Sequence, residues 1–172
     1  MSEDRTDKEK RMMQAKLNAQ ERRDMIAKLR ALPAQLEAVV APLTREQLMT
    51  HFQPKEWNVA QNVHHLADAH MNSFTRLKLI LTEEHPTFKS SDTDRWAALP
   101  DADNPDVENS LHLLSGLHAR MATLFETLND DQWLKSGVRA DGNDISVEDL
   151  LRIYSGHGER HIEQINQTLA AR

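Results

Sequence analysis

The 172-residue sequence contains no cysteine, so this chain can supply no disulfide, thiolate metal ligand or cysteine nucleophile. Glycine and proline are scarce, at 5 and 6 residues, which is about half their share in an average domain. No apolar run approaches the roughly 20 residues that span a bilayer, and residues 1–16 lack the apolar region of a secretory signal. The scarcity of glycine and proline favours helices over strands. Because neither a membrane span nor a secretory signal is visible, we expect a soluble, cytoplasmic protein.

Basic residues are outnumbered by acidic ones, 21 to 27, which gives a formal net charge of −6. A negative balance without a basic stripe disfavours contact with phosphate backbones and anionic membranes. We therefore expect neither a nucleic-acid nor a membrane partner, and we expect a small-molecule substrate. Nine histidines are present, and without cysteine any bound metal must be held by imidazole or carboxylate groups.

Apolar residues recur every three or four positions in four long stretches, which is typical of amphipathic helices. The predicted helices run from Asn18 to Pro42, from Asn58 to His85, from Asn104 to Leu128 and from Ser146 to Leu169. Because no strand pattern is visible, the sequence predicts an all-α four-helix bundle. We expect a charged tail at 1–17, a single domain at 18–172, and a long connection at 83–105 that can cross the bundle.

Two prolines give local expectations within this pattern. Pro105 follows Asn104 and predicts a helix start there, because proline is favoured in the first helical turn. Pro33 lies inside the first predicted helix and is expected to kink or split it. Short helices are expected at 44–50, where a capping-box pattern begins, and around 94–98.

Two histidines, His157 and His161, stand four residues apart in the fourth predicted helix. This spacing places both imidazoles on one face, one turn apart, where they can reach a single metal ion. The pair borders the apolar stripe and should face the bundle interior. The alternative is two partly buried histidines satisfied by hydrogen bonds alone. HGERH is not a zincin motif, because Gly158 replaces the glutamate and Glu159 lies on the far side of the helix.

A third metal ligand would have to come from another helix, and the second predicted helix offers three candidates. Only His70 lies on the main apolar stripe of that helix, while His64 and His65 flank the stripe on opposite sides. Periodicity does not choose among them. Four other histidines fit ordinary loop or helix-surface positions: His51, His85, His112 and His118. For His118 the core is an alternative.

Several segments, in order along the chain, resemble one protein family. WNVAQNVHHL, at 57–66, is similar to the W-[ST]-V-x-x-x-x-x-H-L signature of DinB-like four-helix proteins. Further similarity to the YfiT-like branch, described as metal-dependent hydrolases, covers four segments: 64–87, 94–101, 110–120 and 154–165. The resemblance extends from about residue 30 to the C-terminus.

This resemblance implies an up-down-down-up bundle that holds one Zn²⁺ or Ni²⁺ per chain. It assigns the ligands to His65, His157 and His161. It also makes His64 and Asp68 supporting residues beside the metal. The family further implies a homodimer.

Three neutral ligands leave a metal with an open position, which suits catalysis better than a closed structural site. The expected activity is hydrolysis by a metal-activated water, with no further catalytic residue assigned. DinB-like relatives include thiol S-transferases, so the first alternative is conjugation of a low-molecular-weight thiol to an electrophile. The second alternative is a non-catalytic binding module with a role in stress responses.

Overall fold

The computed structural model describes residues 16–51 and 56–170. Four long helices form the body of the molecule: α2 (Ala19–Val40), α4 (Val59–Thr82), α6 (Glu108–Glu126) and α8 (Val147–Ala170). The connections hold three short helices and two short strands: α3 (Arg45–Met49), α5 (Thr93–Ala97), α7 (Asp130–Trp133), β1 (Ser136–Val138) and β2 (Asp144–Ser146). The predicted four-helix bundle is confirmed.

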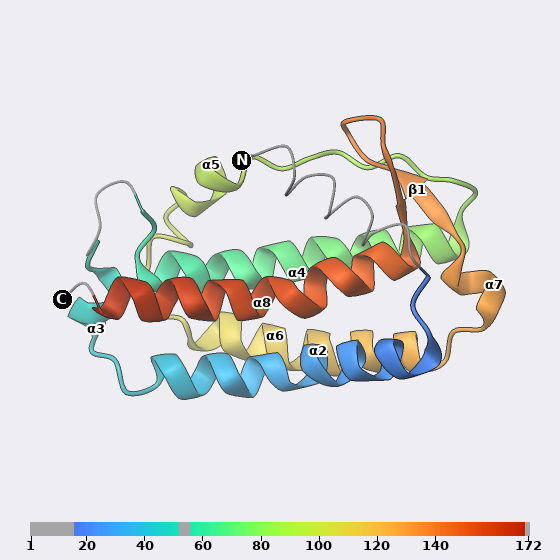
Figure 1. Cartoon of the computed structure of the whole chain (residues 1–172). Coiled ribbons are helices and arrows are strands. Elements are labelled where there is room, and N and C mark those ends of the chain that lie inside the picture. The colour runs from blue at the N-terminus through green and yellow to red at the C-terminus, as the bar shows by residue number, and fades with distance from the viewer. Residues whose placement is uncertain (1–15, 52–55, 171–172) are drawn as a thin grey trace, which may run out of the picture.

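The four helices do not simply alternate in direction along the chain. α2 and α8 run one way, and α4 and α6 run the other (Figure 1). α2 packs against α6 and α8, and α4 packs against the same two helices. Residues 83–107 make this up-down-down-up order feasible, because they return along the bundle and carry α5 back beside the start of α4 (Figure 1).

Capping side chains determine where three of the long helices begin. Asn18 and Asn58 each form a capping box with the residue three positions later. At the start of α8, the Ser146 hydroxyl accepts from the Asp149 N–H at 3.0 Å, and the Asp149 carboxylate accepts from the Ser146 N–H at 3.0 Å. The sequence patterns predicted all three starts.

The start of α6 was predicted wrongly. This helix begins at Glu108, and its N-cap, Val107, makes no side-chain capping bond. The side chain of Asn104 instead accepts from the N–H of Asp106 at 2.9 Å, which closes a turn before the helix. The Asn-Pro pair therefore marks a turn and not the first helical residues.

Of the two outcomes expected for Pro33, a kink or a split, the split is excluded, because α2 runs continuously from Ala19 to Val40. Pro33 is buried and has no N–H with which to close the bond to the carbonyl four residues earlier. That carbonyl belongs to Leu29, and the side chain of His118 on α6 bonds to it. The proline is tolerated because a neighbouring helix supplies the missing donor.

The two short strands were not predicted from the sequence. β1 and β2 pair in antiparallel register, with Gly137 opposite Ile145. A Cβ on Gly137 would lie 2.6 Å from the backbone oxygen of Pro86, so glycine is required there. Three-residue strands are too short to show an alternating pattern, which is why the sequence gives no signal for them.

The interior contains two hydrophobic clusters, one toward each end of the bundle. The first includes Leu29, Leu77 and Leu150, and the second includes Leu36, Leu66 and Ile165. His70 and His118 are fully buried near the boundary of the two clusters, since His70 lies between Ala67 and Phe74 on α4 and His118 directly follows Leu117 on α6. A polar layer therefore interrupts the core near its middle.

Part of the predicted N-terminal tail belongs to the core. Leu17 is 5% exposed, and its N–H donates to the buried carboxylate of Glu148 on α8. Residues 1–15, which make up the rest of the predicted tail, lie outside the described residues. Within 16–51 and 56–170, no helix is long and apolar enough to cross a membrane.

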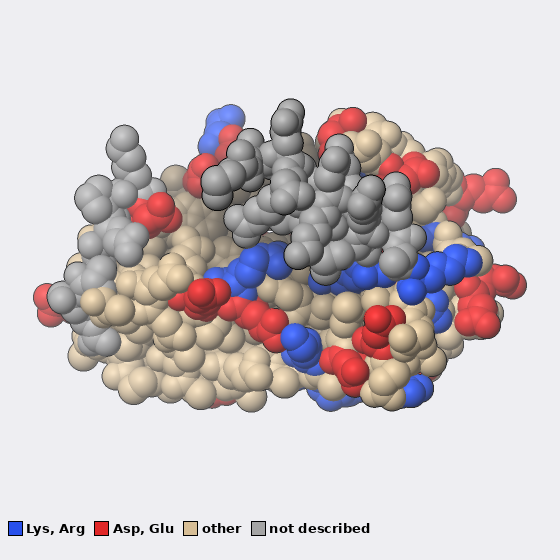
Figure 2. All heavy atoms as spheres, viewed as in Figure 1, with Lys and Arg blue, Asp and Glu red and all other residues tan. Residues whose placement is uncertain are grey.

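Acidic and basic side chains lie among one another on the face shown in Figure 2. Some of them join neighbouring helices, since Lys28 on α2 pairs with Glu159 on α8 at 3.1 Å and Arg30 pairs with Glu126 on α6 at 2.8 Å. Such exposed pairs each contribute about 0–1 kcal/mol. Glu159 is confirmed as a solvated surface charge and not as a group of the histidine site.

Replacing Gly158 by alanine should destabilise the protein, because an added Cβ would lie 2.1–2.7 Å from the side chain of Leu32 on α2. We expect the free energy of unfolding to fall by about 1–3 kcal/mol, as for other overpacked cores. Gly116→Ala on α6 is the matched control, because nothing lies within 4 Å of its added Cβ. That control should gain up to about 1 kcal/mol from helix propensity. Urea unfolding of both variants measures this, and a Gly158→Ala protein as stable as Gly116→Ala would contradict close α2–α8 contact.

Candidate metal centre

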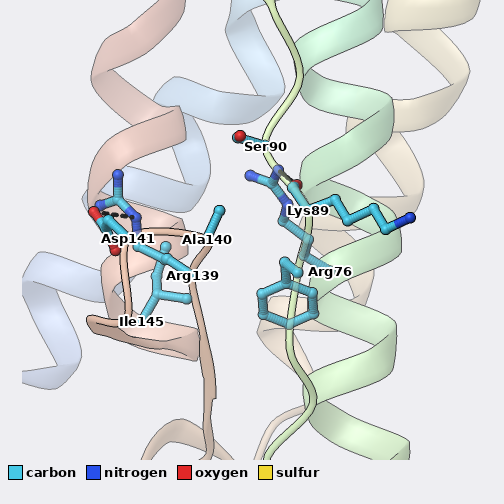
Figure 3. A pocket seen from close by; sticks show the side chains of 8 residues that line it. Arg76, Lys89, Ser90, Arg139, Ala140, Asp141 and Ile145 are labelled. Carbon is cyan, nitrogen blue, oxygen red and sulfur yellow. Dashed lines mark hydrogen bonds and ion pairs between the residues drawn. The ribbon is translucent and has the colours of Figure 1, made fainter.

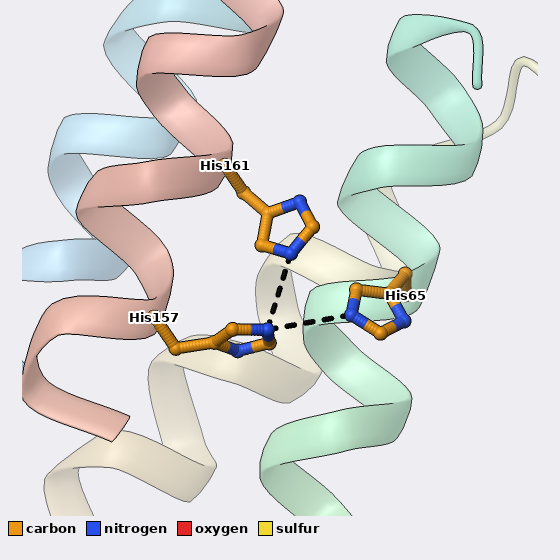
Figure 4. Close-up of side chains that lie close together, drawn as sticks. All are labelled: His65, His157 and His161. Atoms are coloured by element: carbon orange, nitrogen blue, oxygen red, sulfur yellow. Dashed lines mark hydrogen bonds between the residues drawn. The ribbon is translucent and has the colours of Figure 1, made fainter. Parts of the chain in front are cut away.

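Three histidines from two helices converge on one point. His65 comes from α4, and His157 and His161 come from successive turns of α8 (Figure 4). The Nε2 atom of His157 lies 3.4 Å from Nε2 of His65 and 3.1 Å from Nε2 of His161. One ligand atom from each residue fits within a 4.8 Å span. The structure thus brings together the three residues that the resemblance named as ligands.

The ring of His161 is oriented by a buried amide. Its Nδ1 lies 2.8 Å from Oδ1 of Asn62, which is fully buried on α4. The Asn62 amide nitrogen donates to the carbonyl of Asn58 at 2.9 Å, so its oxygen must face His161. Because an amide oxygen only accepts, His161 carries its proton on Nδ1 and presents the Nε2 lone pair to the centre.

The ring of His157 is held from behind by a second set of groups. Its Nδ1 lies 3.1 Å from Nε2 of His70. Nδ1 of His70 lies 2.8 Å from Nε2 of His118, whose Nδ1 lies 2.5 Å from the carbonyl oxygen of Leu29. Three imidazoles and a backbone carbonyl therefore form a continuous line from the centre into the bundle.

These histidines are neutral near pH 7, because burial opposes their protonation. Burial, and then the neighbouring His161, His65 and Arg160, lower the pKa of His157 to about 3. Burial, with His65 and Arg160, lowers the pKa of His161 to about 4. Burial also lowers the pKa of His65, with Asp94 opposing it, and lowers the pKa of His118, with the Leu29 carbonyl opposing it. A metal ion requires neutral imidazoles, and this site provides them without first having to lose protons.

The arrangement fits a cation because at least one ring directs a lone pair into the cluster. With a proton on Nδ1 of His161, its Nε2 can only accept, and it lies 3.1 Å from Nε2 of His157. Tetrahedral coordination at a metal–nitrogen distance of about 2.0–2.1 Å places ligand nitrogens about 3.3 Å apart. The two separations to Nε2 of His157, 3.1 and 3.4 Å, match that value, and the three ligand atoms together lie within 4.8 Å. The residues present therefore suit a divalent metal.

An indole from the start of α4 lies against the centre. The ring of Trp57 is 4.8 Å from the ring of His65 and stacks with that of His161 at 6.4 Å. Its Nε1–H donates to Asp94 of α5 at 3.2 Å, so the returning connection holds it in place. All three ligand candidates keep some exposed surface.

The structure turns His64, one of the two predicted supporting residues, away from the centre. His64 faces α6, where its Nδ1 lies 2.8 Å from the Ser110 hydroxyl and its Nε2 lies 2.8 Å from the carbonyl oxygen of Asn104. Both of its ring nitrogens are engaged there. The pKa of Asp68, the other predicted supporting residue, is raised by burial and by Asp101, while His64 opposes the rise. Its role beside the metal stays a prediction.

Sequence reasoning missed the residues that do support the centre. Periodicity leaves His70 as one of three ligand candidates and His118 at a helix-surface or core position, and no motif marks Asn62. The available signal was a polar side chain on the buried side of a helix, because such a group needs a hydrogen-bond partner. Asn62, His70 and His118 are each 0% exposed, so all three meet that criterion.

A separate hollow of about 370 Å³ lies between the hairpin and the segment that follows α4 (Figure 3). Arg76, Phe88, Lys89 and Arg139 are among its lining residues, and none of the three histidines is. Its guanidinium groups already have partners, since Arg76 donates to the carbonyl of Lys89 at 3.0 Å and Arg139 lies 3.7 Å from Asp141. The histidine cluster is therefore the stronger candidate site.

Known proteins with similar sequences share most of this chain. Residues 28–165 match the DinB superfamily. A relative from Geobacillus thermodenitrificans, which bears the provisional name of metal-dependent hydrolase, is 40% identical over 153 residues, or 88% of this chain and 85% of the relative. YfiT of Bacillus subtilis, with the same provisional name, is 40% identical over 140 residues, or 81% of this chain and 79% of YfiT.

Solved structures agree with these sequence matches. The structure of YfiT from Bacillus subtilis, described as a four-helix bundle of unusual topology, gives a TM-score of 0.87 at 36% identity and covers 90% of this chain and 89% of that one. A mycothiol-dependent maleylpyruvate isomerase gives a TM-score of 0.63 at 17% identity, covering 87% and 68%, and this likeness shows the fold alone. The predicted resemblance is confirmed, and the chain belongs to the DinB superfamily.

Proposed function

We propose that this protein is a metal-dependent hydrolase whose divalent ion, Zn²⁺ or Ni²⁺, is held by His65, His157 and His161. The observation that carries the proposal is the convergence of one ring nitrogen from each of three histidines within 4.8 Å, with the Nδ1 atoms of His157 and His161 each bonded to a buried partner. The provisional names of the relatives support the same chemistry.

An ion held by these three residues would supply Lewis acidity at an open position and would make a water bound there more acidic. The chain's own residues prepare the site for that ion. Asn62 keeps the proton of His161 on Nδ1, and the His70 ring lies 3.1 Å from Nδ1 of His157. Trp57 lies beside His65 and His161 and forms one wall next to the approach from solvent. Because the three candidate ligands are neutral, the ion would keep its full charge for the substrate.

Two other functions use the same bundle. A metal with an open position can also bind and ionise a thiol, so the first alternative is transfer of a low-molecular-weight thiol to an electrophile. This chain has no cysteine, so any thiol at the site would have to come from outside. The second alternative is a binding module without turnover. The homodimer and the cytoplasmic location remain predictions from the sequence.

Purified protein supplied with Zn²⁺ or Ni²⁺ should carry about one metal per chain, as three convergent histidines require. His161→Ala should lose most of the metal and keep the helical content, because the side chain is removed from a partly exposed position. His112→Ala is the matched control, since His112 is an exposed histidine on α6 and should not affect metal content. Elemental analysis and circular dichroism measure the two quantities. A His161→Ala protein with wild-type metal content would contradict the ligand assignment.

The metal-free protein should lose stability as the pH falls from about 7 to about 5. Histidines of the unfolded chain take up protons near a pKa of about 6.5, whereas burial holds the pKa of native His157 at about 3. The unfolded state therefore binds more protons in this window, and stability falls as the pH falls. His157→Gln removes one such group and should make the loss smaller by about 1–2 kcal/mol.

Urea unfolding of the metal-free wild type and of His157→Gln at both pH values measures this difference. The exposed-site control His112→Gln should show the wild-type loss, because His112 is an exposed residue of α6. Equal losses in the wild type and in His157→Gln would contradict a neutral, buried His157.

The hydrolase and the thiol transferase should separate in one assay. With metal bound, we expect turnover of ester or amide model substrates in the absence of thiol, and no metal-dependent loss of thiol with a model electrophile. Substrate cleavage and free thiol are followed in parallel, with His161→Ala as the metal-deficient control. Metal-dependent consumption of the thiol, without hydrolysis across a broad substrate panel, would favour the transferase. Inactivity in both assays despite full metal content would favour the binding module.

A further inference from the structure

The line of imidazoles behind His157 has a direction that is determined by its far end. The carbonyl oxygen of Leu29 can only accept, so His118 must donate to it from Nδ1. His118 is buried without a carboxylate among its hydrogen-bond partners. It is therefore neutral, and its Nε2 is an acceptor.

The same reasoning passes to the next two rings. Nε2 of His118 accepts, so His70 must donate from Nδ1 across the 2.8 Å contact. His70 is 0% exposed and its ring stacks on that of His118, with centroids 4.7 Å apart. As a neutral ring it has only Nε2 left as an acceptor, and His157 must donate to it from Nδ1. Only Nε2 of His157 then carries a free lone pair, and it faces His65 and His161.

We propose that His70 and His118 are positioning residues that hold His157 in the tautomer able to bind a metal through Nε2. The relay is defined by four groups: the Leu29 carbonyl, His118, His70 and His157. The reverse direction would place a proton on Nε2 of His157, where it would exclude the ion. This inference rests on the proposed metal site, but the tautomer can be measured without any metal.

Pro33 explains why the relay can end where it does. In an uninterrupted helix, the carbonyl of Leu29 would accept from the N–H of residue 33, and proline has none. The carbonyl is thus available to the side chain of His118. The relay contains no carboxylate, which distinguishes it from the carboxylate–histidine pairs that support many metal sites. It therefore fixes the proton without adding negative charge to the centre.

The first experiment is nitrogen NMR of the metal-free wild type labelled at histidine. We expect His157, His70 and His118 each to carry the proton on Nδ1, with Nε2 unprotonated. A proton on Nε2 of His157 would overturn the proposal. Since this measurement needs no variant and no metal, it also separates the relay from the proposed function. A wild-type protein that binds no metal but shows these tautomers would contradict the proposed hydrolase function and would still support the relay.

The second experiment removes the acceptor from His70. His118→Leu should raise the dissociation constant for Zn²⁺ about 10–100-fold, as loss of such supporting bonds does elsewhere. The matched control is His64→Leu, which removes another buried, doubly bonded histidine that contacts Ser110 and Asn104 instead of the relay. Competition with a chromophoric chelator gives the affinities, and thermal unfolding shows that both variants fold.

Both variants should be less stable than the wild type, because each loses two buried hydrogen bonds. Only His118→Leu should lower the affinity for Zn²⁺ and change the tautomer of His157 seen by NMR. Equal metal affinities in the two variants would mean that His118 only fills the core. If His118→Leu does not fold, the tautomers of the wild type still decide the question.

Discussion

The central constraint in this bundle is the burial of imidazole rings between two hydrophobic clusters. A ring of this kind is stable in a core only when its polar atoms have partners. Here His70 and His118 bond to each other. At one end of the pair His118 bonds to the Leu29 carbonyl of α2, and at the other end His70 bonds to His157 of α8. This polar layer therefore links side chains or backbone of all four long helices to the three-histidine site between α4 and α8.

The two helices that carry the centre hold their histidines by different means. On α8, His157 is held through the bundle interior, while His161 is held from across the cluster by Asn62 of α4. Asn62 is in turn fixed by the carbonyl of the residue that caps α4. A local feature of helix initiation thus affects Asn62, four residues later, and through it the site. Gly158, between the two α8 histidines, allows close contact with α2 on the opposite side.

The fold and part of the site could be predicted from the sequence. Apolar periodicity and capping motifs predicted the four long helices. The i, i+4 spacing predicted the pairing of His157 and His161, because helix geometry alone brings them together. His65 needed the family resemblance, since periodicity could not separate it from His64 and His70. The contacts of His64, Asn62 and His118 depend on how α4 and α6 pack against their neighbours. Three-residue strands and a turn at Asn104 carry too little pattern to be predicted.

Pro33 also has a consequence for how the helices find their alignment. Apolar stripes tolerate a slide of one turn, about 5.4 Å, because leucines can replace leucines along them. The carbonyl of Leu29 has no equivalent one turn away, because it alone faces Pro33 and so lacks a helical N–H partner. Carbonyls in the neighbouring turns of α2 already accept from the N–H four residues later. The bond from His118 to Leu29 therefore selects one register of α2 against α6, as single buried polar groups do in coiled coils. In this chain, a residue usually associated with broken helices serves to align two intact ones.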